Sequence, residues 1–169
     1  RPGRVVERED ALEEAQRLAQ LGATRERAED VRKLLPSLDR LRVEVDILTD
    51  GTLDYPEDVL AAADYVIASV HHDSHMPTDC MTERVVRAVS SGWVDILGHP
   101  TGRIFGVRPS LPMDFPAVAQ ACASYGTALE VSGYTNRFDL NDERIREAKK
   151  FGGIFSTNTD AHFVDHLDN

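Results

Sequence analysis

The chain lacks several features that would assign it to a class at once. No apolar run approaches the roughly 18–20 residues that a membrane-spanning helix needs, and the first residues do not resemble a signal peptide. Cysteine is scarce: Cys80 and Cys122 lie far apart, and neither has a CxxC neighbour. This scarcity argues against a disulfide framework or a zinc knuckle. We therefore expect a cytoplasmic protein without a membrane partner.

The chain also lacks an excess of basic residues. Its 169 residues include 19 Lys and Arg against 29 Asp and Glu, which gives a formal net charge of −10. Surfaces that bind nucleic acid are usually basic, because neutralisation of phosphates supplies most of the affinity. If this chain acts on DNA, another part of the protein must therefore bring the DNA to it, or divalent metals must supply the positive charge.

Apolar runs and helical patterns alternate from residue 43 onwards. Strands are predicted at 43–48, 65–70, 94–97, 128–131 and 154–157. Helices are predicted at 56–63, 82–90, 115–125 and 141–151, with Thr82, Asp114 and Asn141 as N-caps, and two charge-rich helices precede them at 7–21 and 24–35. This alternation predicts a parallel sheet, either open or closed into a barrel. No Gly-rich phosphate loop follows the first strand, which argues against a Rossmann or P-loop fold.

Residue types that bind metals follow the predicted strands. Glu44 and Asp46 share one face of the first strand, opposite Val43 and Val45. The later strands carry or precede further candidates: His71-His72-Asp73, His99, Glu130 and Asp160-Ala161-His162. In a barrel the carboxyl ends of the strands gather at one face, where the chemistry takes place. We therefore expect these side chains to converge.

Each candidate alone is a weak signal. A single histidine at a strand end is more often a capped or surface residue than a ligand, and Asp-x-His occurs by chance, although positions i and i+2 of a strand share a face. We expect His75 and His166 to be exposed to solvent. The joint pattern favours a metal site, because imidazole and carboxylate together suit zinc, manganese or iron. Such a cluster activates water and neutralises phosphate charge, as phosphoester hydrolysis requires.

Four ordered motifs together resemble the PHP (polymerase and histidinol phosphatase) domain. They are VEVDIL at 43–48, IASVH at 67–71, DILGHPTGR at 95–103 and TDAH at 159–162. Their order and spacing fit from about residue 42 to 169. DGTLDYP at 50–56 and NRFDL at 136–140 further resemble the PHP domain at the C-terminus of bacterial family X DNA polymerases.

This resemblance implies a fold and a set of site residues. The fold would be an α/β, distorted (β/α)7 TIM-like barrel that binds up to three divalent metals, Mn2+ or Zn2+. By resemblance Glu44 bridges two ions, and the other ligands are His71, His99, Asp160 and His162. Glu44, His99 and Asp160 are the expected catalytic residues. Arg103 and Arg137 are candidates for phosphate contacts, and a structural or surface role for these two arginines is equally compatible with the sequence.

The resemblance also implies an activity. A PHP domain of this subgroup would be a metal-dependent phosphoesterase, typically a manganese-dependent 3′–5′ exonuclease that supports DNA repair synthesis. Residues 1–169 would form one such domain of a larger polymerase chain. Its partners would be DNA 3′ ends and the polymerase domains of the same chain. Two alternatives stay open: a histidinol-phosphate phosphatase with the same ligands, and a degenerate PHP module that only braces the polymerase.

The sequence departs from the family pattern near its start. PHP domains open with His-x-His and carry a further Asp-His segment, whereas here no histidine precedes His71. The predicted helices at 7–21 and 24–35 resemble the helices that follow these two motifs in PHP domains. The connection between the two helices is too short to hold the strand that PHP domains have there. Either segments are absent from this sequence or the ligands have been lost. We favour the first, because a missing strand would expose core worth about 25 cal/mol per Å² in a domain stable by only about 5–15 kcal/mol. With at most five ligands, we expect weakly occupied or empty metal sites.

Overall fold

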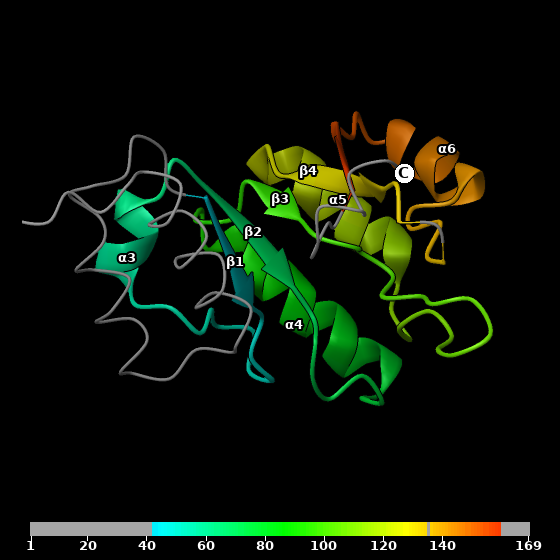
Figure 1. The fold of residues 1–169 in the computed structure, drawn as a ribbon, viewed down its shortest axis with the longest axis horizontal. Coiled ribbons are helices and arrows are strands. Elements are labelled where there is room, and N and C mark those ends of the chain that lie inside the picture. The colour runs from blue at the N-terminus through cyan, green and yellow to red at the C-terminus, as the bar shows by residue number, and fades with distance from the viewer. Residues whose placement is uncertain (1–41, 135, 160–169) are drawn as a thin grey trace, which may run out of the picture.

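The computed structural model describes residues 42–134 and 136–159 (Figure 1). The predicted helices at 7–21 and 24–35, and the predicted ligands Asp160 and His162, lie outside the described residues, as does His166. The described elements are β1 (Arg42–Asp46), α3 (Glu57–Ala62), β2 (Tyr65–Ser69), α4 (Thr78–Ser90), β3 (Ile96–Leu97), α5 (Phe115–Tyr125), β4 (Ala128–Ser132), α6 (Asp142–Lys149) and β5 (Phe155–Asn158). Among them, no helix has the length and apolar character to cross a bilayer.

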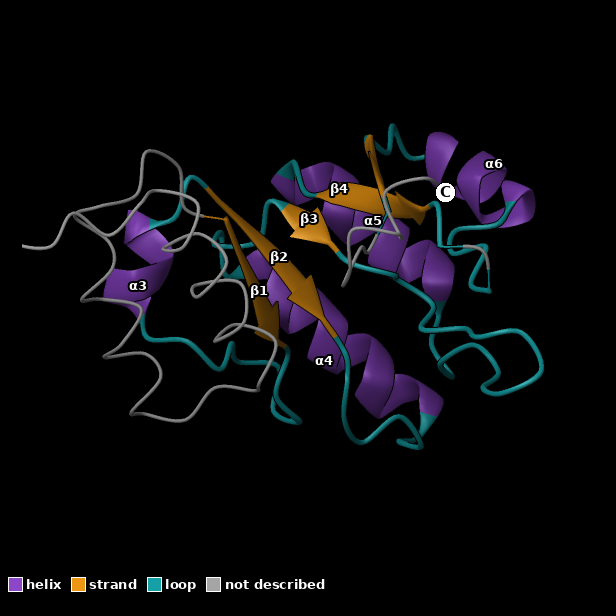
Figure 2. Ribbon diagram, in the orientation of Figure 1, coloured by secondary structure: helices purple, strands orange, loops and turns teal. Residues whose placement is uncertain are grey.

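The strands form one parallel sheet in the order β1-β2-β3-β4-β5. The strand direction turns steadily across the sheet, from β1 and β2 to β4 and β5 (Figure 2). Helices α4 and α5 pack against each other, and α5 also packs against β4. Consecutive parallel strands with this curvature confirm the α/β class and are compatible with a barrel-like fold. No pairing between β1 and β5 is present among the described residues.

The core explains why β1 has one polar face. Val43 and Val45 are buried, whereas Glu44 and Asp46 between and after them are only half-buried. Burying an aliphatic or aromatic side chain stabilises a fold by about 1.5–3 kcal/mol, so the valines determine which way the strand faces. The alternate positions then project the two carboxylates away from this core. Burial in β2 also alternates over its first residues, and its last two residues are both buried.

Most predicted helix ends are close to those of the structure. The side chains of Asp114 and Asn141 cap α5 and α6 by accepting backbone N–H groups, as predicted. The predicted start of α4 is wrong, because the helix begins at Thr78 with Pro77 as N-cap, and Thr82 lies one turn inside it. The Thr82 hydroxyl instead accepts the backbone N–H of Asp114 at 2.9 Å, which joins α4 to the start of α5.

Candidate metal centre

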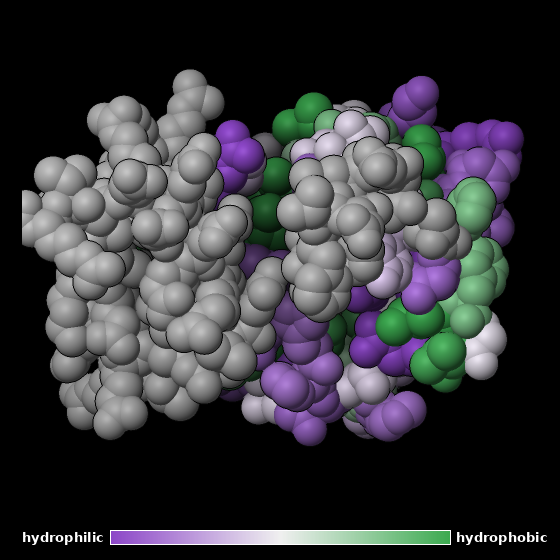
Figure 3. Space-filling model, in the orientation of Figure 1, coloured by the Kyte–Doolittle hydropathy of each residue, from purple (hydrophilic) through white to green (hydrophobic). Residues whose placement is uncertain are grey.

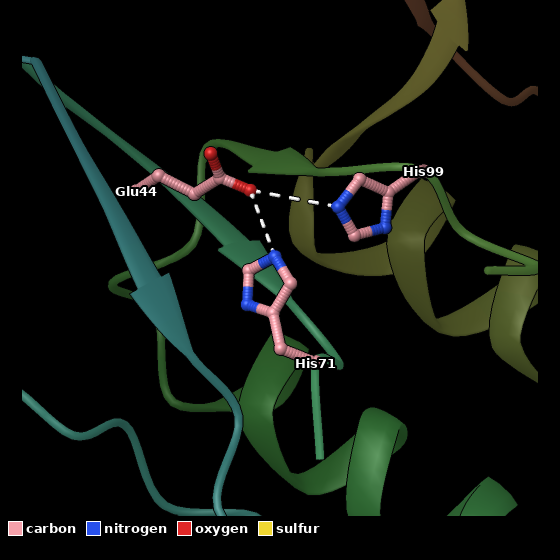
Figure 4. Close-up of side chains that lie close together, drawn as sticks. All are labelled: Glu44, His71 and His99. Atoms are coloured by element: carbon pink, nitrogen blue, oxygen red, sulfur yellow. Dashed lines mark ion pairs between the residues drawn. The ribbon is translucent and has the colours of Figure 1, made fainter. Parts of the chain in front are cut away.

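Three of the predicted ligands converge at the carboxyl ends of neighbouring strands. Glu44 comes from β1, His71 from just beyond β2 and His99 from just beyond β3 (Figure 4). One donor atom from each lies within 4.8 Å of the other two. Glu44 Oε1 is 3.5 Å from His71 Nε2 and 3.6 Å from His99 Nε2. A carboxylate between two imidazoles is a donor set that suits Zn2+ or Mn2+, so the residues present fit a divalent metal.

Ser69, at the end of β2, holds Glu44 in place and lies against Gly98. The Ser69 hydroxyl donates a hydrogen bond to Glu44 Oε1 at 2.8 Å. Gly98 lies directly against Ser69, because a Cβ atom at position 98 would be only 2.4 Å from the Ser69 Oγ. Any other residue at position 98 would force the side chains of Ser69 and Ile67 to shift, so glycine favours the close approach that brings His99 to Glu44.

Asp46 orients His71. Its Oδ1 contacts Nδ1 of His71, and its Oδ2 lies 3.5 Å from Nε2 of His72. A carboxylate on one ring nitrogen fixes the tautomer and the orientation of the ring, which leaves the other nitrogen to bind metal. In this structure that other nitrogen, Nε2, faces Glu44.

The two charges at the site stabilise each other. Burial by itself lowers the pKa of His71, but the hydrogen bonds and negative charges of Asp46 and Glu44 outweigh it and raise that pKa to about 9. For Glu44, burial by itself raises the pKa, but hydrogen bonds from His71 and His99 hold it well below its usual range. Glu44 is therefore ionised at neutral pH, as a metal ligand must be.

His99 is the most enclosed of the three donors. It is 3% exposed, its φ of 26° lies in the left-handed region, and its Nδ1 has no hydrogen-bond partner in the part of the chain that the structure describes. Its backbone N–H donates to the carboxylate of Glu130, which also accepts from Asn158 Nδ2 at 2.9 Å. Glu130 thus connects His99 to the end of β5, and Asp160 follows Asn158 by two residues.

The buried Arg84 of α4 supports the loops around the site. It is 3% exposed, and its guanidinium donates to carbonyl oxygens after both β1 and β2. The acceptors belong to Ile47, Leu48, His72 and Asp73. Arg84 therefore joins the loop that follows Asp46 to the loop that contains His71.

Sequence reasoning placed some functional residues and missed others. The sequence presents Asp46 and Glu130 as metal-binding candidates, whereas their contacts in the structure are with His71 and with the backbone of His99. Ser69 and Arg84 carried no signal, because a serine in a strand and an arginine in a helix are ordinary. His75 is exposed, as predicted.

The predicted phosphate contacts Arg103 and Arg137 lie on neighbouring loops. Arg103 Nε donates to the backbone oxygen of Arg137 at 3.3 Å, and its Nη2 donates to that of Phe138. Arg103 thus links the loop after β3 to the loop after β4. Its role toward phosphate stays a prediction.

Over most of its length, the chain is similar in sequence to known bacterial proteins. It is 41% identical over 126 residues to a Bacillus subtilis (strain 168) protein named "DNA polymerase/3'-5' exonuclease PolX", an alignment that covers 75% of this chain and 22% of that protein. It is 32% identical to probable phosphatases of Thermoanaerobacter sp. (strain X514) and Shewanella sp. (strain ANA-3), over 71% and 70% of this chain. The chain thus spans about a fifth of the Bacillus protein, and 51% and 48% of the two phosphatases. No protein-family model matches it.

Proposed function

We propose that this chain is a PHP-type phosphoesterase domain with a distorted (β/α)7 barrel. The observation that carries the proposal is the convergence of Glu44, His71 and His99 from three successive parallel strand ends onto one point. The similarity to a polymerase-exonuclease and to probable phosphatases supports the same reading. Both kinds of relative are named for cleavage of phosphate esters.

The side chains have distinct roles in this proposal. Glu44, His71 and His99 would hold the divalent cation, Mn2+ or Zn2+, and Asp160 and His162 would complete a site for up to three ions. A divalent cation polarises phosphoryl oxygens and lowers the pKa of bound water. Ser69 keeps Glu44 Oε1 toward the two imidazoles, and Asp46 keeps His71 Nε2 turned toward Glu44. Glu130 holds the backbone from which His99 projects.

The proposed substrate is a DNA 3′ end, cleaved by 3′–5′ exonuclease activity in a cytoplasmic family X DNA polymerase that fills gaps during repair. The net charge of −10 supports a division of labour, in which polymerase domains of the same protein would bind the DNA and the residues of this site would hold the cations that offset the charge of the last phosphodiester.

The direct test is release of nucleotides from a 3′-labelled DNA strand by the full-length protein with Mn2+. We expect His99→Ala and Asp160→Ala to abolish release, because each removes a proposed ligand. His75→Ala is the matched control, since His75 is exposed and apart from the cluster. Absence of Mn2+-dependent release by the full-length protein contradicts the exonuclease proposal.

A second candidate is a phosphatase that acts on a small phosphate monoester such as histidinol phosphate. The probable phosphatases among the relatives favour it. Hydrolysis of histidinol phosphate together with inactivity on DNA would select this candidate. Inactivity on both substrates in the full-length protein would select the structural PHP module.

A further inference from the structure

Two loops beside the site expose a pair of aromatic rings. Phe105, on the loop between β3 and α5, is 52% exposed, and Phe138, on the loop between β4 and α6, is 62% exposed. Their ring centroids are 5.7 Å apart with an interplanar angle of 67°. Val107 adds an 80% exposed side chain to the first loop. These loops lie at the right of the view, where the space-filling picture shows hydrophobic residues beside hydrophilic ones (Figure 3).

This aromatic pair is held in a defined arrangement. The guanidinium carbon of Arg103 lies 4.7 Å from the centroid of the Phe105 ring, and the same side chain donates to the backbone oxygen of Phe138. The backbone N–H of Phe105 donates to the oxygen of Asn136 at 2.8 Å. One arginine therefore contacts both halves of the pair, so the rings and a positive charge form a single surface.

The same loops are anchored to the metal centre. The backbone N–H of Gly102 donates to the oxygen of His99 at 2.8 Å. The buried carboxylate of Asp139, next to Phe138 in the chain, accepts the backbone N–H of Thr101 at 3.0 Å. Both loops follow the carboxyl ends of strands, as Glu44, His71 and His99 do or nearly do, so the aromatic pair and the cluster belong to the same end of the sheet.

We propose that Phe105 and Phe138, with Arg103, form a stacking platform for nucleobases of a single-stranded DNA 3′ end. The proposal rests on the proposed function and names how the site would select a nucleic acid over a small phosphate ester. Every base has a π-face, so stacking on aromatic side chains tolerates any sequence. Arg103, Arg108 and Arg137 concentrate positive charge on these two loops of an acidic chain, which fits a phosphodiester backbone and disfavours a basic partner.

The test compares two substrates in the full-length protein with Mn2+. For Phe105→Ala and Phe138→Ala we expect KM on a 3′-labelled single strand to rise about fivefold or more, the lower end of the loss of one base stack. Hydrolysis of glycerol 2-phosphate, which has no aromatic ring to stack, should stay within twofold of wild type. Phe105→Tyr, unlike Phe105→Ala, should keep the KM on DNA near that of wild type, because tyrosine keeps an aromatic ring at this position. Phe151→Ala, at an exposed phenylalanine just after α6, is the control.

An unchanged KM on DNA in the double variant Phe105→Ala/Phe138→Ala would overturn the platform while leaving the phosphoesterase proposal intact. If the wild-type protein hydrolyses neither substrate, the phosphoesterase proposal fails, and fluorescence anisotropy with a labelled single strand still tests the platform. There we expect abasic sites at the 3′ end to weaken binding to wild type and to have less effect on the double variant. Equal effects on both proteins would overturn stacking and would leave the patch as a surface for another kind of partner.

Discussion

At the scale of single residues, Asp46 and Glu44 act on the same imidazole from two sides. Asp46 contacts Nδ1 of His71, and Glu44 lies 3.5 Å from its Nε2. The two carboxylates raise the pKa of His71 to about 9 against the opposing effect of burial. Without metal, the protonated ring takes the place of a cation between them. Metal binding must therefore displace this proton.

The first prediction concerns pH. The folded pKa of His71, about 9, lies above its ordinary value of 6.5, so protonated His71 stabilises the metal-free fold fully below pH 6.5, and this contribution is lost as the pH rises through 9. Metal affinity has the opposite dependence. We expect Zn2+ affinity to rise about tenfold per pH unit between 7 and 8.5, because one proton leaves. Competition with a chromophoric chelator measures this slope, and a flat profile would contradict the assignment of His71 as a ligand.

The second prediction concerns Asp46→Asn. The neutral amide removes one of the two charges that raise the pKa of His71, so the rise of Zn2+ affinity should level off at a lower pH than in wild type. The plateau should also be about 10- to 100-fold lower, because the carboxylate no longer orients the ring and makes it more basic. Asp142→Asn, at an exposed position of α6, is the control. A variant with the wild-type slope and plateau would show that Asp46 does not act through His71.

At the scale of elements, α4 supports the site through its buried face. Arg84 is enclosed among core residues of this helix, and its guanidinium satisfies carbonyl oxygens of two loops. Loops carry most functional groups, and a rigid scaffold has to position them. Burial lowers the pKa of Arg84, although the nearby charges of Asp73 and Asp46 oppose this effect. These two acids lie in or beside the loops that Arg84 joins.

The third prediction is that Arg84→Met lowers the free energy of unfolding by about 3 kcal/mol or more. Methionine fills similar space but leaves the buried carbonyl of Ile47 without its donor, at a cost of about 1–3 kcal/mol, and it also removes the part-buried bonds to Leu48, His72 and Asp73. Arg87→Met, on the exposed face of the same helix, should stay within about 0.5 kcal/mol of wild type. Urea unfolding without metal separates this effect from metal binding. Equal midpoints for the two variants would show that Arg84 is not a structural link.

The elements themselves were largely predictable. Asp114 and Asn141 mark helix starts by local chemistry, and both cap α5 and α6 as expected. The error at Thr82 has a local cause. A threonine before an apolar run resembles a cap, but here its hydroxyl bonds the backbone oxygen of Thr78 at 2.6 Å within the helix. The N-cap in the structure is Pro77, whose side chain makes no capping hydrogen bond, so the sequence carries no capping signal at that position.

At the scale of the whole molecule, the net charge of −10 opposes the binding of a phosphate, which is itself negatively charged. The cluster gathers a carboxylate and two imidazoles from separate strands, and Asp46 adds a second negative charge beside them. A divalent cation at this point would join three strand ends. A cation that binds only the folded state also raises the free energy of unfolding, by an amount that grows with the logarithm of the free metal concentration once this exceeds Kd.

The fourth prediction follows from this linkage. Zn2+ or Mn2+ at a hundredfold excess over its Kd should add about 2.7 kcal/mol to the free energy of unfolding, which corresponds to a Tm increase of roughly 5–10 °C for a domain of this size. EDTA should reverse the shift. Glu44→Gln should remove most of it, whereas His75→Ala should keep it. Differential scanning calorimetry of the full-length protein checks this, and an equal shift in Glu44→Gln would place the metal elsewhere.

The sequence by itself determined the local features of this protein. The parallel α/β class, the two faces of β1 and the positions of Glu44, His71 and His99 at strand ends all follow from periodicity, because burial and backbone geometry act over a few residues. Only the tertiary structure decided which of these residues meet. Strand order and twist bring three donor atoms within 4.8 Å of one another, and they place Phe105 beside Phe138, 33 positions away in the chain. Such contacts depend on long-range packing, for which a single sequence carries no periodic signal.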